Sequence, residues 1–461
     1  MNQKVLAMAA VIIIVVAGCA VVISSIGGDD QIRFDSSLEI FGNANGDSRL
    51  DSDDASMIDR YIEMNEKGDS TGMKELEIDL TFADANGDGK VDSEDSKLVK
   101  DILDRKEGVK IRMLDGKGNP KSITIRDEYV LASDYTTNAE LVNILGVVDQ
   151  VVAVDKAIFS MKDFYMANCP NKDKLVNYGN QNSSTVSVDL CTQAGVNLWL
   201  CQTDSYTDIK ANAVGEAIYL GLTTSLSGKP SDSTCGQAIL KAGYIFDKVQ
   251  RAEEYVSWLD GIYNSINEKT KDLKDSERPK VLMTYYGHYM LNQSTKTIYA
   301  YTNSYLDAQA AELAGARNII TGHTSDFTSS INLSLEKMAD WEDEIDYVMV
   351  RTIYLSGSGG YTEGVPLNGY VIDDASGFES AGEYLSGLEL LSGIDADQFK
   401  LFCGYLTNDS TCGMLCAAYY AGLFHPDLFS DLDADKIHQE YVSDWLGIDY
   451  DLSKHGVFTN F

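Results

Sequence analysis

The chain has 461 residues, of which 44% are hydrophobic and 10% aromatic, enough apolar side chains to bury the cores of more than one domain. Its 71 acidic and 37 basic residues leave a formal net charge of −34 at pH 7. This balance argues against a nucleic-acid-binding protein, because phosphate contacts need clustered Lys and Arg. It indicates a highly solvated surface, and cation binding only where the local sequence supports it.

The first segment of the chain is a predicted membrane segment at residues 1–28. Lys4 is followed by an uncharged run from Val5 to Gly28, which exceeds the roughly 20 residues that a bilayer-spanning segment needs. We predict an uncleaved membrane anchor, with the remainder of the chain outside the cytoplasm at the cell surface. Residues 16–19 resemble a lipoprotein cleavage box, so a lipid anchor on Cys19 is the alternative; the apolar residues 20–26 favour the uncleaved anchor.

Two acidic twelve-residue loops follow. The second places oxygen-bearing side chains at loop positions 1, 3, 5, 9 and 12 and a glycine at position 6, the spacing by which such a loop wraps Ca²⁺. The first loop repeats the pattern with Asn at position 1 and Ser at position 6, so we expect weaker binding there. Position 7 contributes only a main-chain carbonyl. The predicted calcium ligands are Asn43, Asn45, Asp47, Arg49, Asp51 and Asp54 in the first loop, and Asp84, Asn86, Asp88, Lys90, Asp92 and Asp95 in the second.

Each loop leads into a short amphipathic helix, expected at residues 55–63 and 96–103. The final Asp of each loop, and the Asn-Gly-Asp-Gly core of the second, resemble the duplicated calcium loops of a dockerin domain. The resemblance covers residues 38–107 and implies a small all-α module with two Ca²⁺ sites. It also implies a cohesin-bearing protein as a partner, with a calcium-stabilised spacer as the alternative.

The residues from 109 onward predict an α/β fold made of two Rossmann-like lobes joined by one long helix. An unbroken helical stripe of apolar residues between Pro230 and Pro279 predicts the connecting helix at residues 236–277. The N-terminal lobe is expected at 109–235, with a hairpin at 111–114 and 122–125, strands at 129–132, 151–154 and 198–201, and a helix at 139–145. The C-terminal lobe is expected at 278–461, with strands at 280–284, 318–320 and 347–350, and helices at 304–314, 412–423 and 435–446.

Three stretches of this part, at residues 140–155, 311–318 and 421–429, together with the opening hairpin, resemble the substrate-binding proteins of ABC importers for iron-siderophore, haem and cobalamin. The resemblance implies a ligand cleft between the lobes and a single rigid helix joining them. It also implies an ABC permease as a partner, contacted through one acidic side chain on each lobe. Asp189 and Glu336 are the residues at those places, with a solvated helix face as the alternative.

Ligands are expected to meet the loops at the carboxyl ends of the strands. The predicted ligand-binding residues are Asp134, Tyr135, Asn180, Gln181, Gln202, Tyr285, Tyr286, His288, Arg351 and Thr407. Phenolate and imidazole are iron ligands, so Tyr285, Tyr286 and His288 are candidates for holding haem iron or a ferric chelate, with a packing surface as the alternative. Arg351 is expected to pair with an anionic siderophore or to form a structural ion pair.

An enzyme is not predicted, because the chain has 5 histidines and none of the nucleophile, phosphate-binding or metalloprotease motifs. Seven cysteines follow Cys19 and allow at most three internal disulfides; we expect Cys403, Cys412 and Cys416 to be buried or disulfide-bonded rather than metal ligands. We therefore predict a membrane-anchored receptor that presents an iron complex, or a related chelate such as cobalamin, to an ABC permease. The alternative is a dockerin-mediated surface scaffold or adhesion protein without a transport role.

Overall fold

The computed structural model describes residues 13–16, 19–22, 32–181, 186–223, 228–285, 291–292, 297–322, 330–334, 336, 339–352, 368–377, 393–407 and 410–461. Within the expected membrane segment, two short strands fall in these ranges, β1 (Ile13–Val16) and β2 (Cys19–Val22), and they pair antiparallel. None of the helices in the described ranges is both long enough and apolar enough to cross a bilayer. The anchor and the lipidation of Cys19 remain predictions, since most of residues 1–31 lies outside the described ranges.

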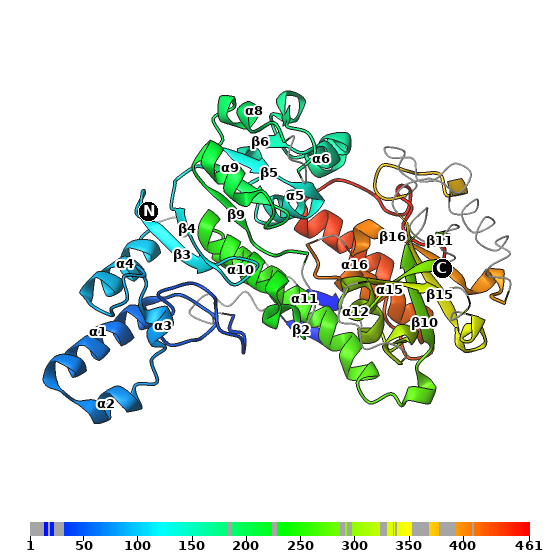
Figure 1. Cartoon of the computed structure of the whole chain (residues 1–461), viewed down its shortest axis with the longest axis horizontal. Coiled ribbons are helices and arrows are strands. Elements are labelled where there is room, and N and C mark those ends of the chain that lie inside the picture. Colours follow the sequence, from blue (N-terminus) through cyan, green and yellow to red (C-terminus); the bar gives the residue numbers. More distant parts are fainter. Residues whose placement is uncertain are drawn as a thin grey trace, which may run out of the picture.

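The dockerin-like module contains four helices, α1 (Ser52–Lys67), α2 (Ser70–Glu75), α3 (Leu80–Ala83) and α4 (Ser93–Leu103), which form a separate group in Figure 1. The last residues of each acidic loop also start the following helix. Asp51 caps α1 and Asp92 caps α4, and in each case a carboxylate three residues later accepts a hydrogen bond from the backbone of the capping residue. The same carboxylates therefore shape the loop and begin the helix.

The N-terminal lobe is built on a parallel sheet in the order β7-β6-β5-β8-β9. Its central strands β5 and β8 are fully buried and, apart from Ser133, apolar, as expected for a sheet covered on both faces. The strands are β5 (Leu131–Ser133), β6 (Val151–Val154), β7 (Val176–Asn177), β8 (Leu198–Cys201) and β9 (Ala217–Tyr219), preceded by the hairpin β3 (Lys110–Leu114) and β4 (Pro120–Thr124). The helices are α5 (Tyr135–Ile144), α6 (Lys156–Ser160), α7 (Lys162–Tyr165), α8 (Val188–Gln193) and α9 (Thr207–Val214).

The connection between the lobes is two helices, α10 (Thr234–Phe246) and α11 (Val249–Thr270), so the prediction of one continuous helix was wrong. The chain breaks at Asp247, whose φ of 58° ends α10 in the left-handed region. Gly243 allows the two helices to pack closely at the break, because a Cβ on this residue would lie 2.8 Å from Cβ of Ala252. Both helices bury an apolar face, which is why the stripe in the sequence runs on across the break.

The C-terminal lobe has a mixed sheet in the order β11-β12-β10-β15-β16, with β13 beside β10 and β14 beside β12. Strands β10, β15 and β16 are parallel, and β12 runs antiparallel to β10. The strands are β10 (Lys280–Tyr285), β11 (Leu291–Asn292), β12 (Thr297–Tyr301), β13 (Arg317–Asn318), β14 (Ser330–Ser334), β15 (Tyr347–Thr352) and β16 (Phe399–Cys403). The helices are α12 (Leu306–Leu313), α15 (Met414–Phe424) and α16 (Ala434–Glu440).

Two predicted elements of this lobe end differently from the prediction. The expected strand at 318–320 stops at Asn318, and residues Ile319–Gly322 form a 3-10 turn. The expected helix at 435–446 changes into a π-helical turn at Tyr441–Trp445. Figure 1 shows α10 and α11 running between the N-terminal lobe, which carries α8 and β6, and the C-terminal lobe, which carries α15 and β15.

The dockerin-like module packs directly against the N-terminal lobe and α10. Backbone hydrogen bonds between residues 39–41 and β3 extend the β3-β4 hairpin (Leu114 N to Glu39 O, 3.0 Å). At the first acidic loop, the Tyr244 hydroxyl from α10 accepts from Leu50 N at 2.9 Å and lies 3.2 Å from Leu50 O. Arg49 reaches α11 and pairs with Glu253 at 2.7 Å. The first loop is therefore held by the connecting helices.

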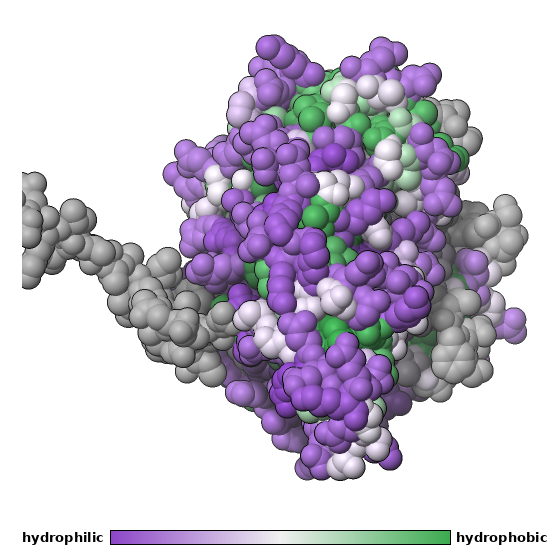
Figure 2. Space-filling model, turned by 90° about the vertical axis from the view of Figure 1, so that its left-hand side faces the viewer, coloured by the Kyte–Doolittle hydropathy of each residue, from purple (hydrophilic) through white to green (hydrophobic). Residues whose placement is uncertain are grey.

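The surface of this part of the molecule is strongly polar. Figure 2 views the molecule from the side on which the module lies, and hydrophilic residues cover most of that face. This agrees with the solvated acidic surface expected from the composition.

A disulfide joins the connecting helices to the C-terminal lobe. Cys235 lies in the first turn of α10, and Cys412 lies just before α15, with a Cα–Cα distance of 5.8 Å. The neighbouring Ser410 donates from its backbone N–H to Glu140 on α5 at 2.7 Å and from its hydroxyl to Thr137 O at 2.5 Å. This stretch of the C-terminal lobe is thus fastened to both α10 and α5. The other cysteines in the described ranges, Cys169, Cys191, Cys201, Cys403 and Cys416, are buried free thiols.

Candidate ligand site between the lobes

The C-terminal half of the site is a cluster of tyrosines around a buried arginine. Tyr285 is the last residue of β10 and Arg351 the last but one of the adjacent parallel strand β15. The two are partners in register, so both lie at the carboxyl edge of the sheet. Arg351 donates from Nη1 to the Tyr305 hydroxyl at 2.5 Å, and its guanidinium carbon lies 5.9 Å from the centre of the Tyr285 ring. Tyr305 stacks on Tyr301 with ring centres 4.2 Å apart. We call Tyr285, Tyr301, Tyr305 and Arg351 the tyrosine-arginine cluster.

Asp307, in the first turn of α12, lies against this cluster. Its Oδ2 is 3.6 Å from Nη1 of Arg351, and both side chains are almost completely buried. Burial alone opposes the charged form of Arg351, but Tyr305 and Asp307 raise the pKa of the guanidinium well above its ordinary value. Burial raises the pKa of the Asp307 carboxyl, and Arg351 is the largest of the contributions that act against this shift. The two groups form a buried ion pair.

Tyr135 brings the N-terminal lobe to the same place. It is the first residue of α5, two residues after the end of β5, and adopts a φ of 58°, which is uncommon for a residue with a bulky side chain. Its phenol lies near enough to Arg351 to contribute to the raised pKa of the guanidinium. The tyrosine-arginine cluster thus lies near Tyr135 of the other lobe.

Asp134 lies at the end of β5 as predicted, but the structure argues against a direct role in ligand binding. Its carboxylate is 1% exposed and accepts hydrogen bonds from the Tyr178 hydroxyl (2.6 Å), Trp199 Nε1 (2.7 Å) and the backbone of Gln202 (3.1 Å). It also pairs with the buried Lys210 at 2.5 Å. These four donors occupy the carboxylate inside the lobe, so Asp134 is a structural residue.

The remaining predicted ligand residues are divided among several places. Gln181 and Gln202 hydrogen-bond to each other at 2.9 Å beyond β7 and β8, and Asn180 beside them is exposed. Thr407 is buried and lies close enough to Asp307 to lower the pKa of that carboxyl. Tyr286 and His288 lie outside the described residues, so their proposed role with iron stays a prediction.

Tyr301, Tyr305 and Asp307 were missed by sequence reasoning. Tyr301 ends an antiparallel strand, β12, and Asp307 belongs to a helix, whereas only the ends of expected parallel strands were searched. The signal that was available is the run Tyr299, Tyr301 and Tyr305, which brings three aromatic side chains to the start of α12.

The two predicted permease-docking residues are accessible. Asp189 is exposed in the first turn of α8, and Glu336 is exposed in the C-terminal lobe. Exposure is required for a docking contact but is equally typical of a solvated helix face.

The donor set of the acidic loops suits a hard cation. In the second loop, Asp84 accepts hydrogen bonds from the backbone of Gly87, Asp88 and Gly89, which curls the loop around its first carboxylate. Gly89, at position 6, has a φ of 88°. In the first loop, Ser48 replaces this glycine and has no such positive φ, and its hydroxyl instead accepts from Phe34 N at 2.9 Å. The two loops therefore have different backbones at the same position.

Buried oxygens in both loops favour calcium. The Oδ1 of Asn43 is buried and lacks a hydrogen-bond partner in the described structure. Burial raises the pKa of Asp54 to about 7, and it raises the pKa of Asp95. A bound Ca²⁺ would compensate the amide oxygen of Asn43 and the carboxylates of Asp54 and Asp95. Within the described ranges, however, no three or more His, Cys, Asp or Glu side chains lie close enough together to share a metal.

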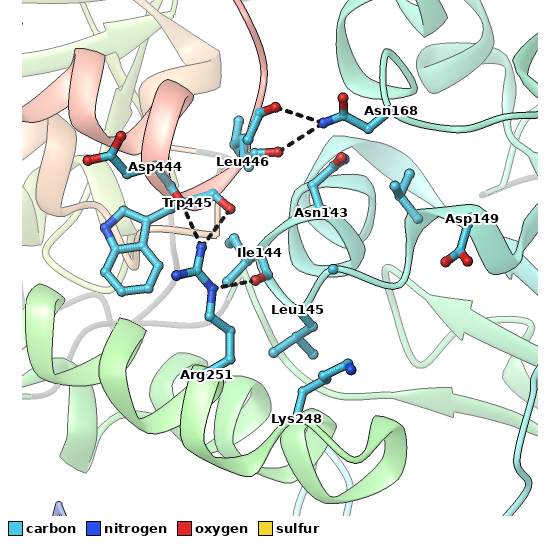
Figure 3. A pocket seen from close by; sticks show the side chains of 13 residues that line it. Asn143, Ile144, Leu145, Asp149, Asn168, Lys248, Arg251, Asp444, Trp445 and Leu446 are labelled. Atoms are coloured by element: carbon cyan, nitrogen blue, oxygen red, sulfur yellow. Dashed lines mark hydrogen bonds between the residues drawn. The ribbon is translucent and has the colours of Figure 1, made fainter. Parts of the chain in front are cut away.

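A separate cavity of about 520 Å³ lies where the lobes meet the connecting helices (Figure 3). Arg251 of α11 spans this junction, with Nε donating to Ile144 O at 3.0 Å and Nη2 donating to Asp444 O at 2.6 Å. Asn168 of the N-terminal lobe donates to Gly447 O at 2.9 Å. These bonds join α5, α11 and the C-terminal residues, so they restrict rotation of one lobe against the other.

Two kinds of known protein are similar to parts of this chain. Residues 42–104 match the family described as the dockerin type I domain. The TroA-like periplasmic binding protein FepB from Veillonella parvula is similar to 76% of this chain over 98% of its own length, with 15% sequence identity and a TM-score of 0.57. The two lobes have the fold of a TroA-like binding protein.

Two further solved structures share this TroA-like fold. The molybdate-binding protein MolA of Haemophilus influenzae has 17% identity and a TM-score of 0.51, covering 74% of this chain and 99% of its own. Helicobacter pylori CeuE with Ni(II) bound has 13% identity and a TM-score of 0.52, covering 73% of this chain and 96% of its own. At these identities the likeness shows the fold alone. No curated protein matches the chain.

Proposed function

We propose that this protein is the extracytoplasmic substrate-binding receptor of an ABC importer and captures a metal chelate, namely an iron complex such as a ferric siderophore or haem, or cobalamin. The observation that carries the proposal is the tyrosine-arginine cluster, which lies at the carboxyl ends of β10 and β15 and near Tyr135 of the other lobe. Aromatic faces with a few fixed polar groups suit a flat or chelated ligand. The binding proteins with the same fold support the class of function.

Thermal unfolding in the presence of chelates tests the proposal. A ligand at 100 times its dissociation constant is expected to stabilise the folded protein by about 2.7 kcal/mol, because it binds the native state and not the unfolded chain. The panel comprises ferric siderophores, haem and cobalamin, and metal-free siderophores serve as the control. Stabilisation by one chelate class identifies the cargo. Absence of any shift across the panel contradicts the receptor function.

We further propose that the dockerin-like module binds two Ca²⁺, the second loop more tightly than the first. Arg33 is the added reason for the difference. Its guanidinium pairs with Asp47 at 2.5 Å and with Asp51 at 2.8 Å, the residues at positions 5 and 9 of the first loop. A calcium ion entering this loop has to compete with that positive charge.

The change Arg33→Gln is therefore expected to tighten calcium binding at the first loop by up to about fivefold, the range of a partly exposed ion pair. Calorimetric titration of chelator-stripped protein measures both sites. Arg60→Gln, on the exposed face of α1, is the matched control and is expected to leave both affinities unchanged. If the first loop binds Ca²⁺ with the same affinity with and without Arg33, Arg33 does not compete with Ca²⁺ for this loop.

A docking role through the module is the second candidate function. Residues on the outer faces of α1 and α4, such as Asp53, Arg60, Lys97 and Lys100, are exposed, so a cohesin-bearing protein has access to them. Calcium-dependent capture of a purified cohesin domain, lost on chelation, supports this role. Capture that does not depend on calcium contradicts it. The packing of the module against α10 and α11 gives the docked receptor a set orientation.

A further inference from the structure

The cleft has little positive charge to offer to an anionic cargo. Arg351 is the cation of the C-terminal half, and its charge is matched by Asp307 at 3.6 Å. In the N-terminal half, Lys210 is matched by Asp134 at 2.5 Å. Asp155, at the end of β6, adds a further carboxyl whose pKa is raised to about 7 by burial. The two ion pairs balance, and the exposed Lys156 that follows Asp155 offsets the charge of that carboxyl, so these described groups leave little net charge.

The sequence of the loops that follow the strands points the same way. The described residues that follow β16, 404–407 and 410–413, include no Lys or Arg. The net charge of −34 on the whole chain also disfavours the approach of an anion.

The ion pair of Arg351 and Asp307 still has hydrogen-bonding capacity. The two carboxylate oxygens of Asp307 and the Nε of Arg351 make no hydrogen bond of normal geometry within the described structure, although Thr407 lies close enough to Asp307 to lower the pKa of that carboxyl. The pair thus has both acceptor and donor atoms left, beside three tyrosine rings. A chelate with both amide-type donors and acceptors can hydrogen-bond to both members of this ion pair. The Asp307 carboxylate repels a multiply charged anion.

We propose that Asp307 is a specificity-determining residue that cancels the charge of Arg351, so that the site selects a metal chelate without net negative charge. This inference rests on the proposed function as a chelate receptor. It places the cargo among neutral or cationic complexes, such as ferric trihydroxamates, and excludes trianionic tricatecholates as good ligands. A multiply charged anion that binds here loses its hydration, and no unpaired cation of the site compensates that cost.

The test compares two probes on the full-length protein at low ionic strength, using quenching of intrinsic fluorescence. One probe is a neutral ferric trihydroxamate and the other a trianionic ferric tricatecholate. The wild-type protein is expected to bind the neutral probe at least about tenfold more tightly. In Asp307→Asn, the uncompensated Arg351 is expected to improve binding of the trianionic probe by about tenfold or more, with the neutral probe changed by less than about threefold.

The matched control is Asp272→Asn, which removes an equally charged but exposed carboxylate beyond α11 and is expected to change neither affinity. The double variant Arg351→Gln/Asp307→Asn removes both charges, so it provides a second test in case the single variant misfolds. It is expected to keep the wild-type preference for the neutral probe. A strong gain for the trianionic probe in the double variant would contradict the role of Arg351.

The possible failures are distinguishable. If the wild-type protein binds the trianionic probe as tightly as the neutral probe, or if Asp307→Asn leaves the ratio of affinities unchanged, the inference about charge is overturned and the receptor function stands. If neither probe binds, and haem and cobalamin also fail, the receptor function itself is overturned. Both conclusions require that each variant is folded, and the melting temperature of each protein verifies this.

Discussion

Replacing Lys210 with methionine is expected to lower the free energy of unfolding by about 3–5 kcal/mol, the cost of leaving a buried charge without its partner. The Lys210 ammonium lies 2.5 Å from Asp134, and each side chain is 1% exposed. The ammonium also lies 5.2 Å from the centre of the Trp199 ring. Methionine fills a similar volume, so the loss reports the missing charge rather than a cavity. Urea unfolding followed by circular dichroism measures the change.

The exposed Lys436→Met on α16 is the control for this variant and is expected to stay within about 0.5 kcal/mol of the wild type. Asp134→Asn combined with Lys210→Met is expected to cost less than the sum of the two single changes, because the buried charges are removed together. Strict additivity of the two changes, or a loss below about 1 kcal/mol for Lys210→Met, would show that the pair is not the stabilising unit described above.

Removing the disulfide between Cys235 and Cys412 is expected to have an effect of similar size. The bond closes a loop of 177 residues, for which the chain-entropy model gives about 5 kcal/mol, and measured losses are usually about 2–5 kcal/mol. Reduction also frees the stretch around Ser410 from α10 and leaves it held to α5 by hydrogen bonds alone. The double variant Cys235→Ala/Cys412→Ala is the direct test, measured by thermal unfolding with and without a reductant.

The reductant provides the internal control. It is expected to lower the melting temperature of the wild-type protein and to leave that of the double variant unchanged, since the other cysteines in residues 32–461 are free thiols. Thiol titration of the denatured, unreduced chain from residue 32 onward is expected to find the 5 free thiols Cys169, Cys191, Cys201, Cys403 and Cys416. Finding seven thiols there would contradict the bond.

The sequence predicted the elements that depend on local patterns. Strands β6 and β8 begin and end where the apolar runs predicted them, because a buried parallel strand is apolar on both faces. The acidic loops were placed by residue spacing, and the capping role of Asp51 and Asp92 explains why a helix follows each loop. Tyr285, Arg351 and Tyr135 were found by taking the carboxyl ends of the expected strands, and the structure brings these three together.

Other parts of the prediction failed where distant contacts decide. The apolar stripe of residues 236–277 is compatible with one helix or with two, and the close packing of Gly243 against Ala252 selects two. Asp134 follows a strand like the other candidates, but Tyr178, Trp199 and Lys210 enclose it. Nothing in the spacing of the cysteines distinguishes the pair that forms the bond from the free thiols.

The amino-acid sequence by itself determined the dockerin-like repeat, the α/β class of the lobes and the positions of the oxygen-rich loops, because these depend on periodicity and spacing within short stretches. Only the tertiary structure decided the electrostatics of the candidate site. Asp307 begins a helix after β12, whereas Arg351 ends a strand more than forty residues later, and their ion pair exists because the sheet and α12 bring them to 3.6 Å. Charge compensation acts through space, so no local pattern in the chain reveals it.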